Sequence, residues 1–207
     1  ELYRCIGDTG KFLRQEVAKG TDILFESANG IHLDIDHGTF PFVTSSAVGP
    51  AAIPQSCGLP NVHLDRIIGV IKCYATRVGE GPFPSEISGK LADRIREAGN
   101  EFGTTTGRPR RIGWFDIDKT KEAVELTGAT EIAIMHFDTL EGMDHIRMMI
   151  GGELIYLKGW TSLLGRGFYE FVKTIEQEVG VPVSMAGYGP ERDQIEMRSV
   201  VRHVVGS

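Results

Sequence analysis

A stretch of hydroxyl and guanidinium groups near the middle of the 207-residue chain contains the residue types that bind anions. It reads Gly103-Thr104-Thr105-Thr106-Gly107-Arg108-Pro109-Arg110-Arg111. Threonine hydroxyls and backbone N–H groups can hold a small carboxylate, and guanidinium groups donate paired hydrogen bonds to carboxylate or phosphate oxygens. We therefore expect an anion-binding loop. The alternatives are a solvated basic turn and a patch that neutralises nucleic-acid backbone through Arg108, Arg110 and Arg111.

The composition restricts the class of protein. A net charge of -6 and a pI near 5.5 argue against a general polyanion binder, so we expect no nucleic-acid partner. The cysteines Cys5, Cys57 and Cys73 are odd in number and far apart, which favours a reduced, cytoplasmic compartment without a disulfide or zinc framework. No apolar run approaches the roughly 20 residues that span a bilayer, and no signal peptide is recognisable. Because the chain opens on Glu1, we expect an upstream portion to be absent.

A second group of chemically capable residues lies in the first third of the chain. If residues 31–39 are extended, the alternation puts His32, Asp34 and Asp36 on one face, which resembles a ligand set for a hard metal. This pattern suggests a metal-dependent hydrolase as a rival function. The competing interpretation is that these side chains form turns and satisfy backbone groups in a glycine-bounded loop.

Apolar spacing and turn residues predict the elements that position these groups. We expect a helix over 11–19 that ends at Gly20, a short buried parallel strand at 23–25 and a surface loop over 49–60. The segment Gly7-Asp8-Thr9-Gly10-Lys11 has the wrong spacing for a phosphate loop and is interpreted as a helix entry. Further strands are expected at 70–76, 131–138 and 182–186, with helices over 86–98, after Asp116 and from Phe168 to Gly180.

The central glycine pair Gly151-Gly152 separates two apolar runs and predicts a β-hairpin over 146–157. Helices and strands otherwise alternate along the chain. This alternation implies an α/β fold, with a largely parallel sheet covered by helices and a small β-hairpin.

Several segments resemble the adenylosuccinate synthetase family. They are Phe25-Glu26-Ser27-Ala28-Asn29-Gly30, residues 34–46, Thr76-Arg77-Val78-Gly79-Glu80-Gly81-Pro82-Phe83-Pro84, Asn100-Glu101-Phe102-Gly103 and Gly113-Trp114-Phe115-Asp116. From about residue 22 onward, nearly the whole chain resembles the latter half of that family. The resemblance implies a fold related to the P-loop NTPases. It also implies that residues 1–207 are the C-terminal part of a single domain whose N-terminal phosphate-loop part is absent from this chain.

The resemblance also implies an activity. In this family GTP and Mg²⁺ phosphorylate the 6-oxo group of a purine nucleotide, and the amine of L-aspartate then displaces phosphate. We therefore expect a ligase of purine biosynthesis that converts IMP to adenylosuccinate with GTP or ATP. A cytoplasmic homodimer is expected, with no membrane partner and no metal ligand in this chain.

The family's functional residues can be carried over to matching positions. On the substrate side, Asn29 would contact the purine edge and is the catalytic candidate of this chain, Thr44 would hold the nucleotide phosphate and Val78 the ribose. Thr104, Thr105, Thr106 and Arg108 would hold aspartate. The residues implied for the nucleoside triphosphate are Arg110, His136, Asp138, Gly187 and Gly189. Without the resemblance, Asp138 would be a turn former, Thr44 a loop hydroxyl and Val78 a core residue.

Some positions depart from the family pattern. Asn29 stands where the family has glutamine, Ser27 where it has glycine and His136 where it has lysine. A shorter amide and an added hydroxyl could accommodate a 2-amino group on the purine, which suggests a phage-type enzyme that uses dGMP and ATP to make 2-amino-deoxyadenylosuccinate. A third alternative is a non-catalytic nucleotide-binding fragment, because the main acid–base residues are expected in the missing half.

Overall fold

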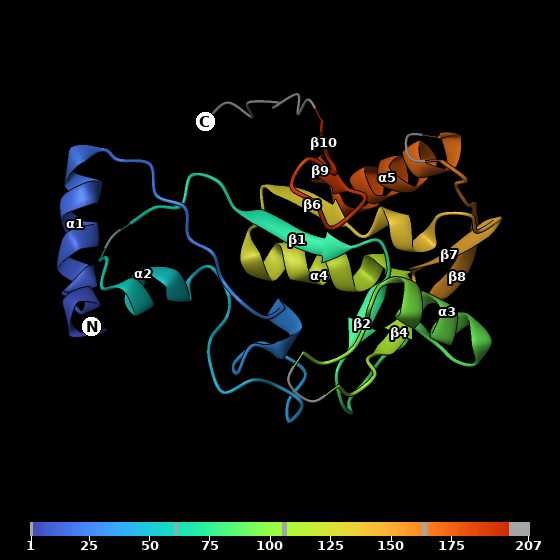
Figure 1. The fold of residues 1–207 in the computed structure, drawn as a ribbon, viewed down its shortest axis with the longest axis horizontal. Coiled ribbons are helices and arrows are strands. Elements are labelled where there is room, and N and C mark those ends of the chain that lie inside the picture. The colour runs from blue at the N-terminus through green and yellow to red at the C-terminus, as the bar shows by residue number, and fades with distance from the viewer. Residues whose placement is uncertain (1, 61, 105–106, 163–164, 199–207) are drawn as a thin grey trace. The chain divides into compact units, whose positions relative to one another are not determined.

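The computed structural model describes residues 2–60, 62–104, 107–162 and 165–198 of the 207-residue chain. The chain divides into two compact units, residues 1–65 (unit 1) and residues 66–207 (unit 2). Figure 1 shows both units. None of the described helices is long and apolar enough to cross a bilayer.

Unit 1 consists of short helices joined by irregular segments. Its elements are η1 (Leu2–Cys5), α1 (Thr9–Lys19), η2 (Ile31–Leu33) and α2 (Ala52–Cys57). The carboxylate of Asp8 accepts a hydrogen bond from the N–H of Lys11, and Gly20 ends α1 in the left-handed conformation with φ 73°. The predicted helix entry at residues 7–11 and the predicted end at Gly20 are therefore confirmed.

Other predictions for unit 1 are wrong. Ile23–Phe25 has no regular secondary structure, and Leu24 is 89% exposed. A strand needs a neighbour to complete its hydrogen bonds, and no described segment pairs with this one. The predicted surface loop over 49–60 contains α2. Residues 31–39 form η2 and turns instead of an extended segment.

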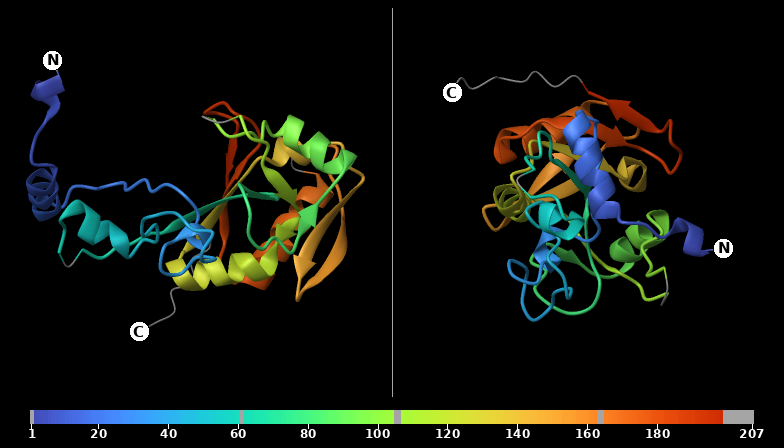
Figure 2. Two further views of the ribbon diagram at one scale, coloured as in Figure 1. Left: turned by 90° about the horizontal axis from the view of Figure 1, so that it is seen from below. Right: turned by 90° about the vertical axis from the view of Figure 1, so that its left-hand side faces the viewer.

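The main sheet of unit 2 has the strand order β1-β6-β9-β10. Its strands are β1 (Ile68–Lys72), β6 (Glu131–Met135), β9 (Val183–Gly187) and β10 (Ile195–Met197). The first three run parallel, and β10 is antiparallel to β9. Figure 2 shows the same strands from two other directions. The predicted α/β fold with a largely parallel sheet is confirmed. Among the described strands β1 pairs only with β6, so it forms an edge.

Two smaller sheets complete the strands of unit 2. The antiparallel sheet contains β2 (Ala75–Arg77), β4 (Arg111–Gly113) and β3 (Glu86–Ile87). The other contains β5 (Phe115–Asp116), β7 (His145–Ile150) and β8 (Glu153–Lys158). Between β7 and β8, Gly151 and Gly152 have φ values of 60° and 78°, as expected for a tight hairpin turn of the primed type. The predicted hairpin is confirmed.

The helices of unit 2 are α3 (Lys90–Ala98), α4 (Ile117–Thr127), α5 (Arg166–Val179) and the 3₁₀ turn η3 (Phe137–Leu140). Asp116 caps α4 by accepting a hydrogen bond from the N–H of Lys119, and α5 ends at Gly180, both as predicted. The helices contribute to one core. Its centre is aromatic, with Phe137, Trp160, Phe168 and Phe171 buried against one another.

Three element boundaries in unit 2 differ from the sequence prediction. The predicted strand at 70–76 is two strands in different sheets, separated at Cys73 and Tyr74. The predicted helix over 86–98 begins at Lys90, because β3 occupies the start of that range. The predicted strand at 131–138 ends at Met135, because His136 adopts the left-handed conformation with φ 67° and leads into η3.

Candidate functional site

A buried carboxylate organises the polar groups at the carboxyl end of β1. Glu101 is fully buried, and its Oε1 accepts hydrogen bonds from Lys72 Nζ at 2.6 Å and from the Tyr74 hydroxyl at 2.5 Å. Its Oε2 accepts a hydrogen bond from Arg110 Nη1 at 2.6 Å. One carboxylate therefore connects the end of β1, the segment that follows it and the arginine-rich loop.

The protonation states follow from these contacts. Burial raises the pKa of Glu101, but hydrogen bonds from Lys72, Tyr74 and Arg110 outweigh burial, so its pKa is lowered and the group is ionised. Burial, followed by the bond to Glu101, raises the pKa of Tyr74, which stays a neutral donor. Lys72 and Arg110 share the single buried carboxylate of Glu101, and the charge of Asp138 also acts on this cluster through His136.

His136 borders this cluster from the end of β6. Its Nδ1 lies 3.5 Å from the Tyr74 hydroxyl and 3.4 Å from the Thr139 hydroxyl, and its ring meets the Tyr74 ring edge-on. Burial, followed by the charge of Lys72, lowers the pKa of His136. A neutral imidazole is therefore present at neutral pH, and the cationic contribution of the cluster comes from Lys72 and Arg110.

The arginine-rich loop is closed by its own backbone. The N–H of Gly103 donates to the carbonyl of Arg108 at 2.9 Å, and the N–H of Gly107 donates to the carbonyl of Gly103 at 2.7 Å. Gly107 has φ 62°, which a residue with a side chain adopts only at a cost. Thr104 is exposed, whereas the predicted site residues Thr105 and Thr106 lie outside the described residues.

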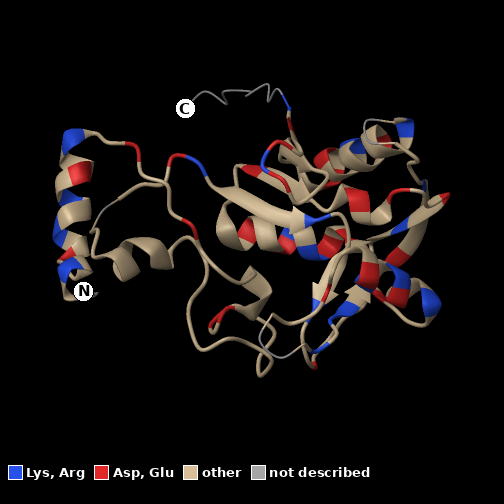
Figure 3. Ribbon diagram, viewed as in Figure 1, with Lys and Arg blue, Asp and Glu red and all other residues tan. Residues whose placement is uncertain are grey.

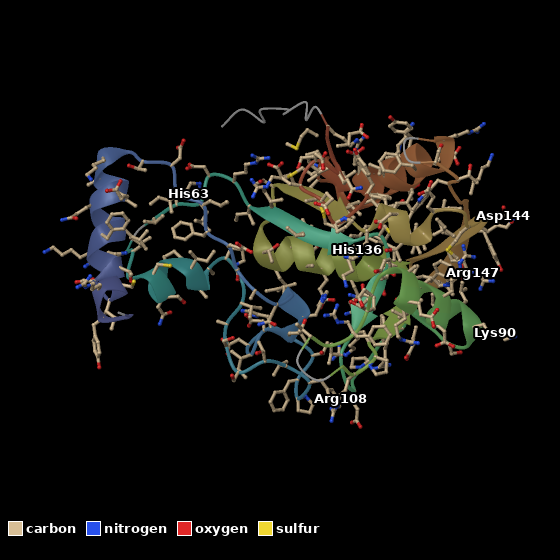
Figure 4. All side chains as sticks on the ribbon, in the orientation of Figure 1. His63, Lys90, Arg108, His136, Asp144 and Arg147 are labelled. Carbon is tan, nitrogen blue, oxygen red and sulfur yellow. The ribbon has the colours of Figure 1, made fainter. Side chains whose placement is uncertain are left out.

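The three arginines, which would act together only in the nucleic-acid alternative, have different surroundings. Arg108 is exposed at the outer part of the loop and well separated from His136 in Figure 4. Arg110 is held by Glu101. Arg111 makes a two-point contact with the carboxylate of Glu86 and donates from Nη1 to the carbonyls of residues 79 and 81. Arg111 thus holds the neighbouring loop, and it has no equivalent role in the candidate anion site.

That neighbouring loop carries Val78. Its side chain is 62% exposed, so Val78 is not a core residue, which was the alternative to a role in substrate binding. Figure 3 shows acidic residues interspersed with the basic residues around β2 and β4. Such mixing fits local ion pairs better than a continuous basic surface.

The residues predicted to hold the nucleoside triphosphate base lie at the carboxyl ends of neighbouring parallel strands. His136 follows β6, and Asp138 is exposed in η3. Gly187 ends β9, where a Cβ would come within 2.5 Å of Met135 Sδ, and a Cβ on Gly189 would come within 2.2 Å of Gln194 Oε1. The carboxyl ends of parallel strands are the usual location of ligands in α/β sheets.

Two predicted substrate-binding residues belong to unit 1. Asn29 is exposed and has φ 70°, a conformation that asparagine tolerates better than most residues. Thr44 is half-buried, and its N–H donates to the carbonyl of Leu33 at 2.7 Å. Asn29 therefore lies at a bend, and Thr44 lies in an irregular segment that is bound to Leu33.

The proposed metal site of the rival hydrolase is not formed. Oδ1 of Asp34 accepts hydrogen bonds from the N–H groups of Asp36 and His37, and Oδ2 accepts from those of Val48 and Gly49. Both oxygens are therefore used by the backbone, as in the competing interpretation of this loop. No group of three potential metal ligands occurs among the described residues.

Unit 1 also contains a cavity away from Asp34. A cavity of about 440 Å³ is lined by Ala51, Pro54, Gln55, Gly58, Leu59 and Pro60. This lining has no charged side chain, so it does not suit carboxylate or phosphate groups. The candidate site is better defined by the loop and by the cluster around Glu101.

Sequence reasoning missed Lys72, Tyr74 and Glu101 as functional candidates. Two hints were present. Lys72 is a charged residue inside an apolar strand, and Glu101 directly precedes the donor-rich loop. Neither hint identifies a partner, because Lys72 and Glu101 are 29 positions apart.

Comparison with known proteins places this chain in a family. Residues 1–159 match the family model for adenylosuccinate synthetase. The chain belongs to the adenylosuccinate synthetase family. Adenylosuccinate synthetase of Syntrophotalea carbinolica is 36% identical over 94% of this chain and 52% of its own length. That of Helicobacter pylori is 40% identical over 91% and 52%, respectively.

Solved structures agree with this membership. The structure of fully ligated adenylosuccinate synthetase from Plasmodium falciparum matches with a TM-score of 0.87 and 29% identity, over 96% of this chain and 55% of that one. The succinoaminodeoxyadenylate synthetase of cyanophage S-2L, bound to dGMP and dATP, matches with a TM-score of 0.63 over 91% of this chain and 49% of that one. At 20% identity the phage match supports the fold alone. The chain spans about half the length of the adenylosuccinate synthetases that it matches.

Proposed function

We propose that the full-length protein joins L-aspartate to C6 of IMP, giving adenylosuccinate, with hydrolysis of a nucleoside triphosphate. The observation that carries this proposal is the attachment of Arg110 to the buried Glu101 beside an exposed, donor-rich loop. The arrangement places positive charge at the carboxyl ends of parallel strands, where anionic substrates are expected.

The proposed reaction has two steps. As N1 of IMP loses its proton to a base, the 6-oxo oxygen attacks the γ-phosphorus of the triphosphate, and the nucleoside diphosphate leaves. The aspartate amine then forms a bond to C6, the C6–O bond breaks, and phosphate departs while the nitrogen loses a proton. Because charge moves onto phosphate oxygens in both steps, positioned cations lower the barrier.

The residues of this chain would bind and orient the substrates. Arg108 would hold the carboxylates of aspartate together with Thr104, Thr105 and Thr106. Arg110 would contact the triphosphate, whose base would lie against Gly187 and Gly189, with Asp138 accepting its N–H donors and His136 beside it.

On the IMP side, Asn29 would contact the purine edge, Thr44 the phosphate and Val78 the ribose through its backbone. Asn29 remains the catalytic candidate of this chain. The main acid and base residues would come from a part of the protein outside these 207 residues.

Mg²⁺ would enter with the triphosphate and neutralise its charge. The described residues offer no cluster of carboxylate, imidazole or thiolate ligands for the ion. Its protein ligands would therefore come from outside the described residues. We further propose a cytoplasmic homodimer, by analogy with the family.

Two alternatives can be separated by experiment. A phage-type reaction with dGMP and ATP is favoured by Ser27, Asn29 and His136, whereas the 36–40% identity to enzymes named adenylosuccinate synthetase favours IMP. A non-catalytic nucleotide-binding role is the alternative of another class.

The deciding experiment incubates the full-length protein, after its mass has been checked, with aspartate and Mg²⁺. IMP or dGMP is combined with GTP or ATP, and released phosphate and the succinylated nucleotide are measured. Turnover with IMP supports the proposal, and turnover confined to dGMP assigns the phage-type reaction. Nucleotide binding with no turnover in any combination would overturn both ligase assignments.

A further inference from the structure

Glu101 is placed to control more than one substrate contact. We propose that Glu101 is a positioning residue that fixes Arg110 and Lys72 as a pair of cationic donors for the phosphate groups of the nucleoside triphosphate. The inference rests on the proposed function for the identity of the ligand. It adds Lys72 as a binding residue and Glu101 as the group that orients both cations.

Arg110 is fixed through its backbone as well as its side chain. Its N–H donates to the carbonyl of Glu101 at 3.0 Å, and its carbonyl accepts from Arg96 Nε at 2.9 Å. Nη1 is bound to Glu101 Oε2. The other guanidinium nitrogens, Nε and Nη2, have no recorded partner in the described part of the chain. Anchoring one nitrogen leaves this second edge available to an anion.

Lys72 lies at the end of β1, where its side chain is 25% exposed. Its ammonium group donates to Glu101 Oε1 at 2.6 Å and to Thr76 Oγ1 at 3.2 Å. An ammonium group has three N–H donors, so one remains for a ligand. Two bonds to fixed acceptors restrict the direction of that third donor.

The charges of Glu101, Lys72 and Arg110 favour an anionic ligand. Glu101 is fully buried and accepts bonds at both oxygens, so it is fully committed to its protein partners. Lys72 and Arg110 exceed it by one positive charge. An anion with several oxygens would neutralise that excess and contact both cations, whereas a neutral base would do neither.

The test is Glu101→Gln in the full-length protein. The amide keeps the shape of the side chain but removes the negative charge that attracts Lys72 and Arg110 and offsets the repulsion between them. We expect the KM for the triphosphate to rise about tenfold, as is usual when a group that orients a charged ligand contact is lost. The KM for IMP and that for aspartate should change by less than about twofold, because neither substrate is proposed to use this pair.

Glu131→Gln is the matched control. Glu131 is also a buried carboxylate paired with an arginine, Arg66, but it lies at the amino end of β6, away from the site. Loss of the Glu131 charge should lower the melting temperature without a selective change in the KM for the triphosphate. If Glu101→Gln lowers the melting temperature and changes all KM values together, its role is structural and the proposal fails.

Lys72→Met is a second variant that keeps the proposal testable if Glu101→Gln does not fold. It removes one cation and leaves the Glu101–Arg110 pair intact, so we expect a selective rise of about tenfold in the KM for the triphosphate. An unchanged value would overturn the assignment of Lys72.

Direct binding separates this inference from the proposed function. The dissociation constant of a non-hydrolysable GTP or ATP analogue is measured for the wild type and both variants. If the wild type binds the analogue but catalyses no ligation, the proposed function fails, while weaker binding by Glu101→Gln and Lys72→Met still supports the inference. Equal binding by all three proteins overturns the inference even if ligation is observed.

Discussion

At the scale of single residues, the structure distinguishes groups that the sequence presents as equivalent. Arg108, Arg110 and Arg111 lie within four positions, yet Arg110 is held by Glu101 and Arg111 by Glu86. Residue types alone predict an anion-binding loop, and this stays a prediction. Residue types alone could not tell which carboxylate pairs with which arginine, because Glu101 lies 9 positions before Arg110 and Glu86 lies 25 positions before Arg111.

Arg108 is predicted to carry the aspartate contact. Arg108→Leu in the full-length protein should lower kcat/KM for aspartate by about 100-fold, because a charged, paired hydrogen-bond donor to a carboxylate is removed. The control is Arg166→Leu, an exposed arginine at the start of α5 that pairs with Glu170 and should have no effect on turnover. Unchanged kinetics for Arg108→Leu would remove the loop from the aspartate site. Initial rates at varied aspartate concentration provide the measurement.

Asp34 gives a pH prediction for unit 1. The N–H groups of Val48 and Asp36, with smaller contributions from His37 and Gly49, lower the pKa of Asp34 to about 2, against an unfolded value of about 3.9. A lowered folded pKa means that the ionised group stabilises the loop above about pH 4 and that this contribution is lost as the pH falls through about 2.

The measurement is an NMR titration of the Asp34 carboxyl group and of the Val48 and Gly49 amides. Asp34→Asn should shift these amides already at pH 7 and abolish their titration between pH 4 and 2. Asp36→Asn is the control, because the side chain of Asp36 is exposed and accepts none of these four bonds. Identical titrations in the wild type and Asp34→Asn would contradict the assignment.

At the scale of elements, the sequence was most informative where a local pattern alone determines the structure. The apolar stripe of α5 and the glycine pair of the hairpin predicted both elements close to their observed bounds. The break between β1 and β2 could not be predicted, because Cys73 and Tyr74 are compatible with a strand. They are instead buried where the chain passes from one sheet to another.

The hairpin turn depends on a helix that precedes it in the sequence. Asp118, in the first turn of α4, accepts hydrogen bonds from the N–H groups of Gly151 and Gly152 at 3.0 and 2.9 Å. Asp118→Ala should reduce the free energy of unfolding by about 1 kcal/mol, the usual contribution of such bonds near the surface. Glu125→Ala, at an exposed position of the same helix, is the control and should have little effect. Denaturant unfolding compares the two, and equal stabilities would show that the contact contributes nothing.

At the scale of the whole molecule, the two units differ in how much they bury. Of the described residues in unit 1, only Leu59 and Asp34 are buried, whereas unit 2 contains the aromatic core. The sequence does not reveal this difference, since both units contain apolar runs. Burial depends on which segments meet, and the run Ile23–Phe25 meets no partner strand among the described residues.

Limited proteolysis should therefore begin in unit 1. A glutamate-specific protease is expected to cut first after Glu26, which is exposed in an irregular segment, because local unfolding there costs little. Glu131 is buried within β6 and serves as the internal control. Mass spectrometry of early digestion products identifies the cleaved bond. Early cleavage after Glu131 would mean that unit 2 is the less stable part.

The 207-residue chain by itself is predicted to bind nucleotide weakly and to catalyse no ligation. Its described residues contain cationic groups for anions but no metal-ligand cluster. Calorimetry with IMP and with GTP or ATP, beside the phosphate-release assay, tests both statements. Measurable ligation by these residues alone would show that catalysis does not require groups from outside them.

The position of β1 has a practical consequence for handling the protein. One side of this strand has no hydrogen-bonding neighbour among the described strands, and Val70 within it is 69% exposed. An apolar strand with open amide and carbonyl groups is a template for pairing with another chain. Concentrated samples of residues 1–207 should accordingly form aggregates through pairing at β1. Val70→Lys should delay this aggregation, because the lysine charges of paired copies would repel one another.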